Sequence, residues 1–310
     1  MDAMKTRAVK SVLRSMPTIE GAGVHLRRAF GPHEAHLADP FLLLDHFQSE
    51  NHSDYTAGFP WHPHRGIETV TYMIRGTIEH EDSLGNKGVI ESGDVQWMTA
   101  GSGILHQEMP KPYAGDLLGV QLWVNLPASK KMKEPRYREI RADQIPAYSA
   151  SDGVEIKIIA GNLNGIRGPV RDLVADIAFL DVTLERDREL AQEVDPMNSC
   201  VAYVFEGDGI FSEEAVRVSH GNTVFFKEGN SIKVKSDKTG MRLLLITGRA
   251  LREPIAWGGP IVMNKQSELD RTFDELRNGT FIKSERPSDP NRLQSFHGPW
   301  EGSTKKWKMV

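Results

Sequence analysis

The sequence predicts an all-β protein that contains two similar β units. Three observations lead to this prediction. Short runs rich in β-branched and aromatic residues recur between glycine-containing turns, a spacing typical of β-sandwiches and barrels. Helical periodicity is scarce and is clear in one segment near the C-terminus. A strand–turn–strand pattern occurs twice, once in each half of the chain.

The predicted strands follow one another along most of the chain. Each is a short apolar or alternating run that begins or ends near a turn residue. In sequence order they lie at 67–74, 77–82, 87–92, 93–100, 117–126, 154–161, 177–184, 200–207, 223–229, 231–237 and 241–248.

The internal repeat supports two copies of one β unit. Tyr72–Gly76 is followed 17 residues later by Gly93–Met98. Tyr203–Gly207 is followed 14 residues later by Gly221–Phe226. In each copy a strand ends at a glycine turn, a hairpin follows, and a second glycine turn begins another strand. Two related β units therefore explain the length better than one large domain.

The length allows each unit its own core, since 310 residues suffice for two domains of ordinary size. We expect an N-terminal domain at 1–140 and a C-terminal domain at 141–284. The junction is expected within the polar stretch 127–152, which is rich in Lys, Arg and Pro. Residues 285–310 lack a core pattern and are expected to be a surface strap or a disordered tail.

The segment Ser267–Gly279 is the one clear helix. Leu269, Phe273 and Leu276 recur at helical spacing. Ser267 is the expected N-cap, and Gly279 supplies the C-terminal stop.

Composition indicates a soluble globular protein. Hydrophobic residues make up 39% and charged residues 26%, with a formal net charge of −4. No basic stripe predicts nucleic-acid binding. No run approaches the roughly 20 apolar residues of a membrane span, and the first 21 residues lack a signal-peptide core. The single cysteine, Cys200, excludes an internal disulfide and is expected to be a small buried residue. We expect a cytoplasmic protein.

Two pairs of polar residues suggest a metal site. His62 and His64 stand two apart, as do His106 and Glu108, so on strands each pair shares a face. Three imidazoles and one carboxylate suit a divalent transition metal, and the carboxylate favours harder ions such as Fe(II) and Mn(II). Four ligands leave two octahedral positions open for chemistry. The alternative for an isolated His-x-His pair is a strand edge with two solvated imidazoles.

The second copy provides an internal comparison. His62 and His64 are counted back from Tyr72, and His106 and Glu108 are counted on from Gly93. The same counts from Tyr203 and Gly221 in the second copy reach Glu193, Asp195, Val234 and Ser236. The scaffold glycines persist there while the histidines are absent, so the fold itself does not demand the histidines. We therefore expect the C-terminal unit to have a packing role and no metal.

The motifs resemble those of one known family. The stretches 62–86 and 93–110 contain the glycines and histidines of the two cupin motifs, and within the cupins they closely resemble the pirin family, as do 39–47 and 273–281. The resemblance implies a bicupin, with two face-to-face cupin (jelly-roll type) β-barrels, a few short helices, and one metal, commonly iron, in the N-terminal barrel.

Carried over by position, the resemblance implies the metal ligands His62, His64, His106 and Glu108. Many cupins instead use the glutamate at the position of Glu68. We expect Glu68 to be a hydrogen-bond partner of a ligating imidazole. Fe(II) is the expected metal, while Mn, Ni, Co, Cu and Zn remain open.

Pirins resemble flavonol dioxygenases, which implies quercetin 2,3-dioxygenase chemistry on a flavonol-like aromatic substrate with dioxygen. Glu108 would then also act catalytically, taking the proton of the flavonol hydroxyl. A non-enzymatic alternative is a metal-dependent redox sensor, a transcriptional co-regulator or a protein-interaction module with a protein partner. A third is a zinc-dependent hydrolase or isomerase.

Two further polar features have expected positions. Arg65, next to a proposed ligand, is expected either to orient Glu68 or a substrate oxygen or to lie at the surface. His80, Glu81 and Asp82 precede the turn Gly85-Asn86 and are expected at a hairpin rim.

Overall fold

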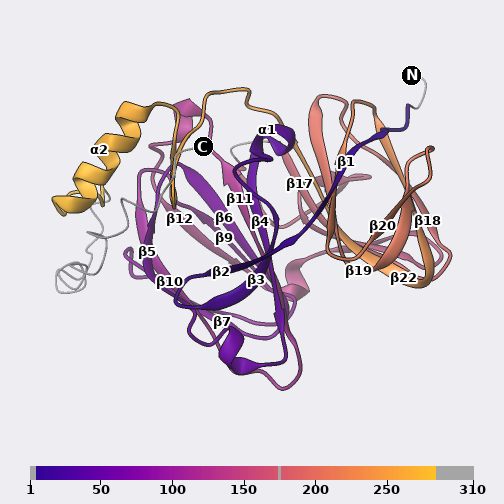
Figure 1. Cartoon of the computed structure of the whole chain (residues 1–310), viewed down its shortest axis with the longest axis horizontal. Coiled ribbons are helices and arrows are strands. Elements are labelled where there is room, and N and C mark those ends of the chain that lie inside the picture. The colour runs from indigo at the N-terminus through magenta and orange to yellow at the C-terminus, as the bar shows by residue number, and fades with distance from the viewer. Residues whose placement is uncertain (1–4, 174–175, 284–310) are drawn as a thin grey trace. The chain divides into compact units, whose positions relative to one another are not determined.

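The computed structural model describes residues 5–173 and 176–283 (Figure 1). The described residues form 24 strands, two α-helices and three 3₁₀ turns. The prediction of an all-β protein with few helices is therefore confirmed. The predicted tail at 285–310 lies outside the described residues.

The strands and helices have the following bounds. The strands are β1 Val9–Arg14, β2 Met16–Glu20, β3 Val24–Phe30, β4 Phe41–Ser49, β5 Phe59–His64, β6 Ile67–Arg75, β7 Ile78–Asp82, β8 Lys87–Ile90, β9 Val95–Thr99, β10 Ile104–Pro110, β11 Leu117–Asn125, β12 Arg136–Ile140, β13 Ala147–Ser151, β14 Val154–Ala160, β15 Asn162–Leu163, β16 Ile166–Arg167, β17 Ile177–Leu184, β18 Glu189–Glu193, β19 Asn198–Phe211, β20 Val216–Ser219, β21 Asn222–Phe226, β22 Ser231–Arg249, β23 Ala256–Gly258 and β24 Ile261–Met263. The helices are α1 Ala35–Ala38 and α2 Gln266–Arg277. Among the described residues, neither helix is long and apolar enough to cross a membrane.

The chain divides into two compact units that are built from non-contiguous segments. One, called here the histidine unit, comprises Thr18–Leu26, His46–Arg141 and Arg252–Val310. The other, called here the apolar unit, comprises Met1–Pro17, Arg27–Asp45 and Ala142–Leu251. Helix α2 thus belongs to the unit that carries the histidine pairs. The domain boundaries expected at residues 140 and 284 stay a prediction.

The apolar unit is filled by hydrophobic side chains. Its nine-stranded sheet runs β1-β21-β19-β22-β17-β14-β13, with β18 beside β22 and β20 beside β19. The long strands β19 and β22 each pair with different neighbours at their two ends. The core contains Ile156, Val182 and Leu243, and also Val234, which occupies one of the positions compared above. Burial of such aliphatic groups stabilises the unit without polar chemistry.

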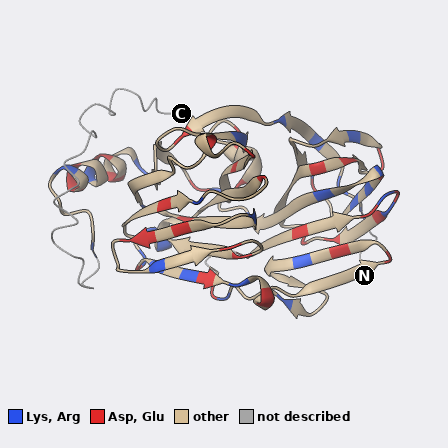
Figure 2. Ribbon diagram, turned by 90° about the horizontal axis from the view of Figure 1, so that it is seen from below, with Lys and Arg blue, Asp and Glu red and all other residues tan. Residues whose placement is uncertain are grey.

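The histidine unit contains a small four-stranded sheet with the order β5-β10-β7-β8. The alternation of β7 places Ile78, His80 and Asp82 on its buried face. The neighbouring seven-stranded sheet has the order β12-β9-β6-β11-β4-β3-β2. Its strand β6 is buried along almost its whole length. Acidic and basic residues are interspersed along the described strands (Figure 2).

Helix α2 begins two residues earlier than predicted. Its N-cap is Lys265 rather than Ser267. The carboxylate of Glu268 accepts hydrogen bonds from the backbone N–H groups of Asn264 at 3.1 Å and Lys265 at 3.0 Å. This reach-back of an acidic N3 residue decides where the helix starts. The predicted stop at Gly279 agrees with its φ of +68°, which favours glycine.

Candidate metal centre

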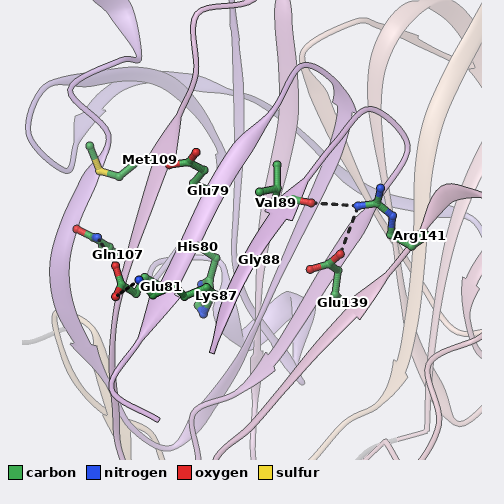
Figure 3. Close-up of a pocket in the computed structure, with 10 residues that line it drawn as sticks. All are labelled: Glu79, His80, Glu81, Lys87, Gly88, Val89, Gln107, Met109, Glu139 and Arg141. Atoms are coloured by element: carbon green, nitrogen blue, oxygen red, sulfur yellow. Dashed lines mark hydrogen bonds and ion pairs between the residues drawn. The ribbon is translucent and has the colours of Figure 1, made fainter. Parts of the chain in front are cut away.

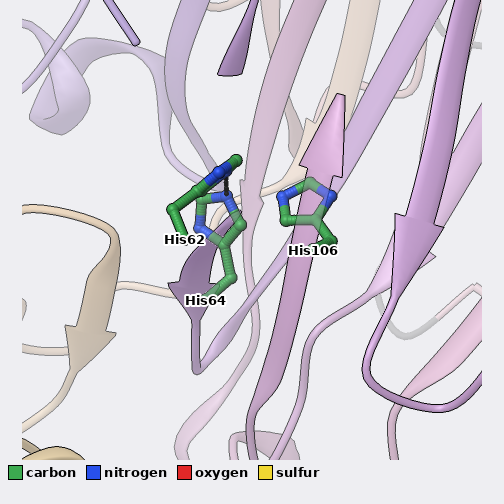
Figure 4. A group of neighbouring side chains, drawn as sticks. All are labelled: His62, His64 and His106. Atoms are coloured by element: carbon green, nitrogen blue, oxygen red, sulfur yellow. Dashed lines mark hydrogen bonds between the residues drawn. The ribbon is translucent and has the colours of Figure 1, made fainter. Parts of the chain in front are cut away.

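Strands β5 and β10 bring three histidines together. The two strands pair antiparallel, and His106 lies opposite His62. One ring nitrogen from each of His62, His64 and His106 lies within 4.8 Å of the other two (Figure 4). The expectation that the two histidine motifs converge from separate strands is therefore met for the imidazoles. That they bind a metal stays a prediction.

Backbone carbonyls fix the tautomers of two of these rings. Nδ1 of His62 lies 2.9 Å from the carbonyl of Pro60, and Nδ1 of His64 lies 3.1 Å from the carbonyl of Pro260. A carbonyl only accepts, so each Nδ1 must carry the proton. The two Nε2 atoms then carry lone pairs, and they face each other at 3.1 Å. Two converging lone pairs repel unless a cation lies between them.

His106 completes the set with two nitrogens that have no hydrogen-bond partner among the described residues. The ring is fully buried, and an unsatisfied buried polar group is costly. Burial also lowers the pKa of His62, and it lowers those of His64 and His106 well below the ordinary value, with neighbouring histidines adding to the effect in all three. All three rings are thus neutral near pH 7, as metal ligands must be. The residues present therefore fit a transition-metal ion.

Glu108 lies beside the histidine cluster on β10 and is buried. Its carboxylate accepts hydrogen bonds from Thr71 Oγ1 at 2.8 Å, Gln121 Nε2 at 2.7 Å and Gln96 Nε2 at 3.5 Å. No Glu108 oxygen belongs to the cluster of possible ligand atoms that lie within 4.8 Å of one another. The structure thus brings together three of the four predicted ligands, while the fourth is held beside them. Its role as ligand stays a prediction.

Glu68 does not support an imidazole, contrary to the expectation from the sequence. Its carboxylate accepts hydrogen bonds from Thr99 Oγ1 at 2.6 Å and Trp97 Nε1 at 3.1 Å, and Arg138 lies 3.6 Å away. These partners come from β9, which pairs with β6, and from β12, which pairs with β9. The imidazole Nδ1 atoms of His62 and His64 take backbone carbonyls instead, so the prediction was wrong.

Arg65 is neither a surface residue nor a partner of Glu68. Its side chain is 2% exposed and donates to the carbonyls of Ser102 and Phe281, both at 2.8 Å, and to Thr272 Oγ1 at 3.0 Å. It also forms a 2.7 Å ion pair with Glu275 of α2. Arg65 therefore docks the C-terminal helix, a role that sequence order alone does not reveal.

His80 lies buried beside the cluster, although its position before the turn Gly85-Asn86 predicted a hairpin rim. Its ring lies 5.4 Å from that of His106 and stacks on Tyr137 at 4.5 Å. Its Nε2 lies 3.3 Å from a carboxylate oxygen of Asp82. The alternation of residues 78–82 could have predicted the buried position, because it places His80 on the same face as Ile78.

A pocket of about 540 Å³ is lined in part by His80 (Figure 3). Its lining mixes acidic, basic and neutral groups, and Arg141 donates there to Glu139 and to the carbonyl of Val89. The lining residues are Glu79, His80, Glu81, Lys87, Gly88, Val89, Gln107, Met109, Glu139 and Arg141.

Aromatic side chains also lie next to the cluster. The ring of Trp123 lies edge-on to His64 at 4.9 Å, and Trp257 lies 6.1 Å from Trp123. Trp123 Nε1 donates to Gln121 Oε1 at 3.2 Å, so this tryptophan also orients the amide that binds Glu108. The surroundings combine flat apolar surfaces with a few oriented polar groups, as small-molecule sites do.

Comparison with known families agrees with this geometry. The family pattern described as Pirin matches residues 23–124, and that described as the Pirin C-terminal cupin domain matches residues 179–282. A pirin-like protein of Caulobacter vibrioides is 41% identical over 279 residues, which cover 90% of this chain and 100% of the relative. The chain belongs to the pirin family.

The pirin assignment extends to other relatives and to solved structures. A Thermoplasma acidophilum protein named "putative quercetin 2,3-dioxygenase" is 43% identical, over 78% of this pirin and 98% of its own length. The crystal structure of a quercetin 2,3-dioxygenase from Acinetobacter baumannii matches with a TM-score of 0.83 and 30% identity, covering 89% of this chain and 99% of that one. The two-cupin fold class predicted from the sequence is thus confirmed.

Proposed function

We propose that this pirin is a metal-dependent dioxygenase that opens flavonols such as quercetin with dioxygen. The observation that carries the proposal is the meeting of the Nε2 lone pairs of His62 and His64 beside the unpartnered nitrogens of His106. The similarity to proteins named quercetin 2,3-dioxygenases supports the substrate class.

The three imidazoles and Glu108 would hold one divalent transition-metal ion, and Fe(II) is the ion we propose, since the carboxylate shifts the preference of the imidazoles towards harder ions. When bound, such an ion would polarise a substrate oxygen and bring dioxygen chemistry within reach. The carbonyls of Pro60 and Pro260 keep the imidazoles in the tautomer that leaves Nε2 available.

Glu108 would take the proton from the flavonol 3-hydroxyl as the substrate binds. Its carboxylate is held in place by Thr71 and Gln121, so its orientation does not depend on solvent. Trp123 offers a flat face beside the imidazoles, suitable for packing an aromatic ring. The surroundings therefore supply a proton acceptor and a wall for a planar substrate.

The direct experiment mixes iron-loaded protein with quercetin in air and follows the flavonol absorbance. We expect catalytic bleaching that requires both iron and dioxygen. Metal analysis of protein produced without added zinc identifies the ion that co-purifies. Fully loaded protein that leaves quercetin intact over many equivalents would overturn the enzymatic proposal and favour the redox-sensor alternative.

The base role of Glu108 is tested by Glu108→Gln, compared at equal metal occupancy. We expect a loss of turnover of about 100-fold or more, the range typical of removing a general base. Glu155→Gln is the matched control, since Glu155 is exposed on β14 of the apolar unit. Unchanged turnover in Glu108→Gln would rule out the base role.

A further inference from the structure

The hairpin formed by β23 and β24 runs beside the end of the histidine strand β5. The N–H of Val262 donates to the carbonyl of Arg65 at 3.1 Å, and Ile261 forms a parallel bridge with Arg65. Pro260 lies between β23 and β24, directly before Ile261. Its carbonyl accepts a hydrogen bond from His64 Nδ1. A segment almost 200 residues away in sequence thus sets the tautomer of a predicted ligand.

One buried lysine joins this hairpin to the histidine strand. The ammonium of Lys131 donates to the carbonyl of Gly66 at 2.9 Å, to Asn125 Oδ1 at 2.7 Å and to the carbonyl of Val262 at 2.8 Å. Lys131 is 2% exposed, and these three acceptors are uncharged oxygens. We call Lys131 and its three partners the lysine clamp.

The clamp acts at a place where the two backbones approach closely. A Cβ on Gly66 would lie 2.0 Å from the carbonyl oxygen of Val262 and 3.3 Å from Lys131 Nζ. Gly66 is two residues after His64, and Val262 is two residues after Pro260. The Lys131 ammonium therefore joins the segment that contains His64 to the segment that contains Pro260. The distance between these two segments determines whether the His64–Pro260 hydrogen bond can form.

We propose that Lys131 is a positioning residue of the metal centre, which holds the Pro260 carbonyl on Nδ1 of His64 and so keeps the His64 Nε2 lone pair available for the ion. This inference rests on the metal centre of the proposed function. Without the carbonyl, the neutral imidazole can carry its proton on Nε2, and a protonated nitrogen cannot be a ligand. Burying a lysine among carbonyl oxygens is costly for stability alone, which fits a residue retained for orientation.

The test compares Lys131→Met with Lys130→Met in full-length protein. Lys130 is exposed on the same 3₁₀ turn, so it controls for the loss of one positive charge. Cobalt(II) is titrated into metal-free protein and its dissociation constant is measured. We expect affinity to fall 10- to 100-fold in Lys131→Met, the usual effect of removing a group that orients a ligand, and to stay at the wild-type value in Lys130→Met.

A second readout does not depend on metal. Long-range ¹H–¹⁵N NMR of metal-free protein labelled at histidine reports which ring nitrogen carries the proton. We expect His64 to carry it on Nδ1 in the wild type and to lose that preference in Lys131→Met. If Lys131→Met does not fold, Asn125→Ala removes one clamp contact and is expected to shift both readouts in the same direction.

The outcomes separate the two ideas. Wild-type protein that binds no cobalt would refute the metal centre, while the NMR comparison would still decide the clamp. A folded Lys131→Met protein with wild-type cobalt affinity, or with His64 still protonated on Nδ1, would overturn the clamp.

Discussion

Arg65 and Glu275 form a 2.7 Å ion pair that ties helix α2 to the residue directly after His64. The guanidinium also lies 4.4 Å from the centre of the Phe281 ring and donates to Thr272 Oγ1. The helix that the sequence predicted by its periodicity is therefore attached to the histidine strand through one arginine. Burial lowers the pKa of Arg65, yet the group remains charged because its ordinary pKa is far above 7.

Arg65→Met should lower the free energy of unfolding by about 3–5 kcal/mol, because it breaks a buried ion pair and leaves carbonyls unsatisfied. Urea unfolding of metal-free protein measures the change. Arg277→Met removes an exposed pair with Asp274 on the same helix and should cost under about 1 kcal/mol. Equal losses in the two variants would show that Arg65 does not anchor α2.

Gly66→Ala should be more destabilising than Gly85→Ala, although both glycines have nearly the same positive φ, +79° and +85°. In Gly85→Ala the added Cβ meets nothing within 4 Å, so only the backbone penalty of about 1–2 kcal/mol remains. In Gly66→Ala the Cβ would lie 2.0 Å from the Val262 carbonyl, which adds about 1–3 kcal/mol. Chemical unfolding of both variants checks the difference, and equal costs would contradict the close approach.

The metal-free protein should lose stability as the pH falls below 6.5. Burial lowers the pKa values of His64 and His106 well below 6.5, whereas the unfolded chain protonates them near that value. The unfolded state then binds more protons, so the free energy of unfolding falls by up to about 1.4 kcal/mol per pH unit for each ring. Urea unfolding between pH 5 and 7.5 measures the slope. His106→Gln should show a shallower slope than wild type, and an identical slope would be evidence against the neutral buried ring.

Lys131 should extend the same trend to alkaline pH, because its lowered pKa also makes the folded state more stable as the pH rises. Burial lowers the pKa of Lys131 to about 7, against 10.5 for an unperturbed lysine. Below pH 7 both states are protonated and the folded state bears the cost of a buried charge. Between pH 7 and 10.5 the unfolded chain holds the extra proton, so the wild type gains stability relative to Lys131→Met by up to about 1.4 kcal/mol per pH unit. Unfolding both proteins from pH 7.5 to 9.5 tests this, and a constant difference would refute it.

Cys200 should be inert in the folded protein. The side chain is buried, and burial raises the pKa of the thiol to about 12. Because the thiolate is the reactive form, a disulfide reagent such as Ellman's should modify Cys200 at the rate of unfolding. Full reaction is expected after denaturant is added. Modification of native protein at the rate of a free thiol would contradict the burial.

Much of the fold follows from local patterns in the sequence. Glycine turns and alternating runs predicted the strands, and the spacing of Leu269, Phe273 and Leu276 predicted the helix. The two-residue spacing of His62 and His64 predicted a shared face, because successive strand residues point to opposite sides. These signals are short-range, so they do not depend on which strands become neighbours.

The helix start and the partners of charged residues could not be read in this way. Glu268 reaches back to place the N-cap at Lys265, and Glu68 turns to partners on β9 and β12. The inward position of His80 becomes meaningful only once β7 pairs with β10, which puts His80 opposite Glu108. Each of these depends on contacts made after the chain has folded.

Glycine turns, strand periodicity and the spacing of the histidines are enough to predict an all-β chain with two related units, one of which carries histidines that could bind a metal. Folding adds that a carbonyl near the C-terminal helix orients His64, that Arg65 anchors that helix, and that Glu108 is held by Thr71 and Gln121. These two levels differ because periodicity is a property of neighbouring residues. A hydrogen bond between positions 64 and 260 instead arises from the packing of segments that the sequence keeps far apart.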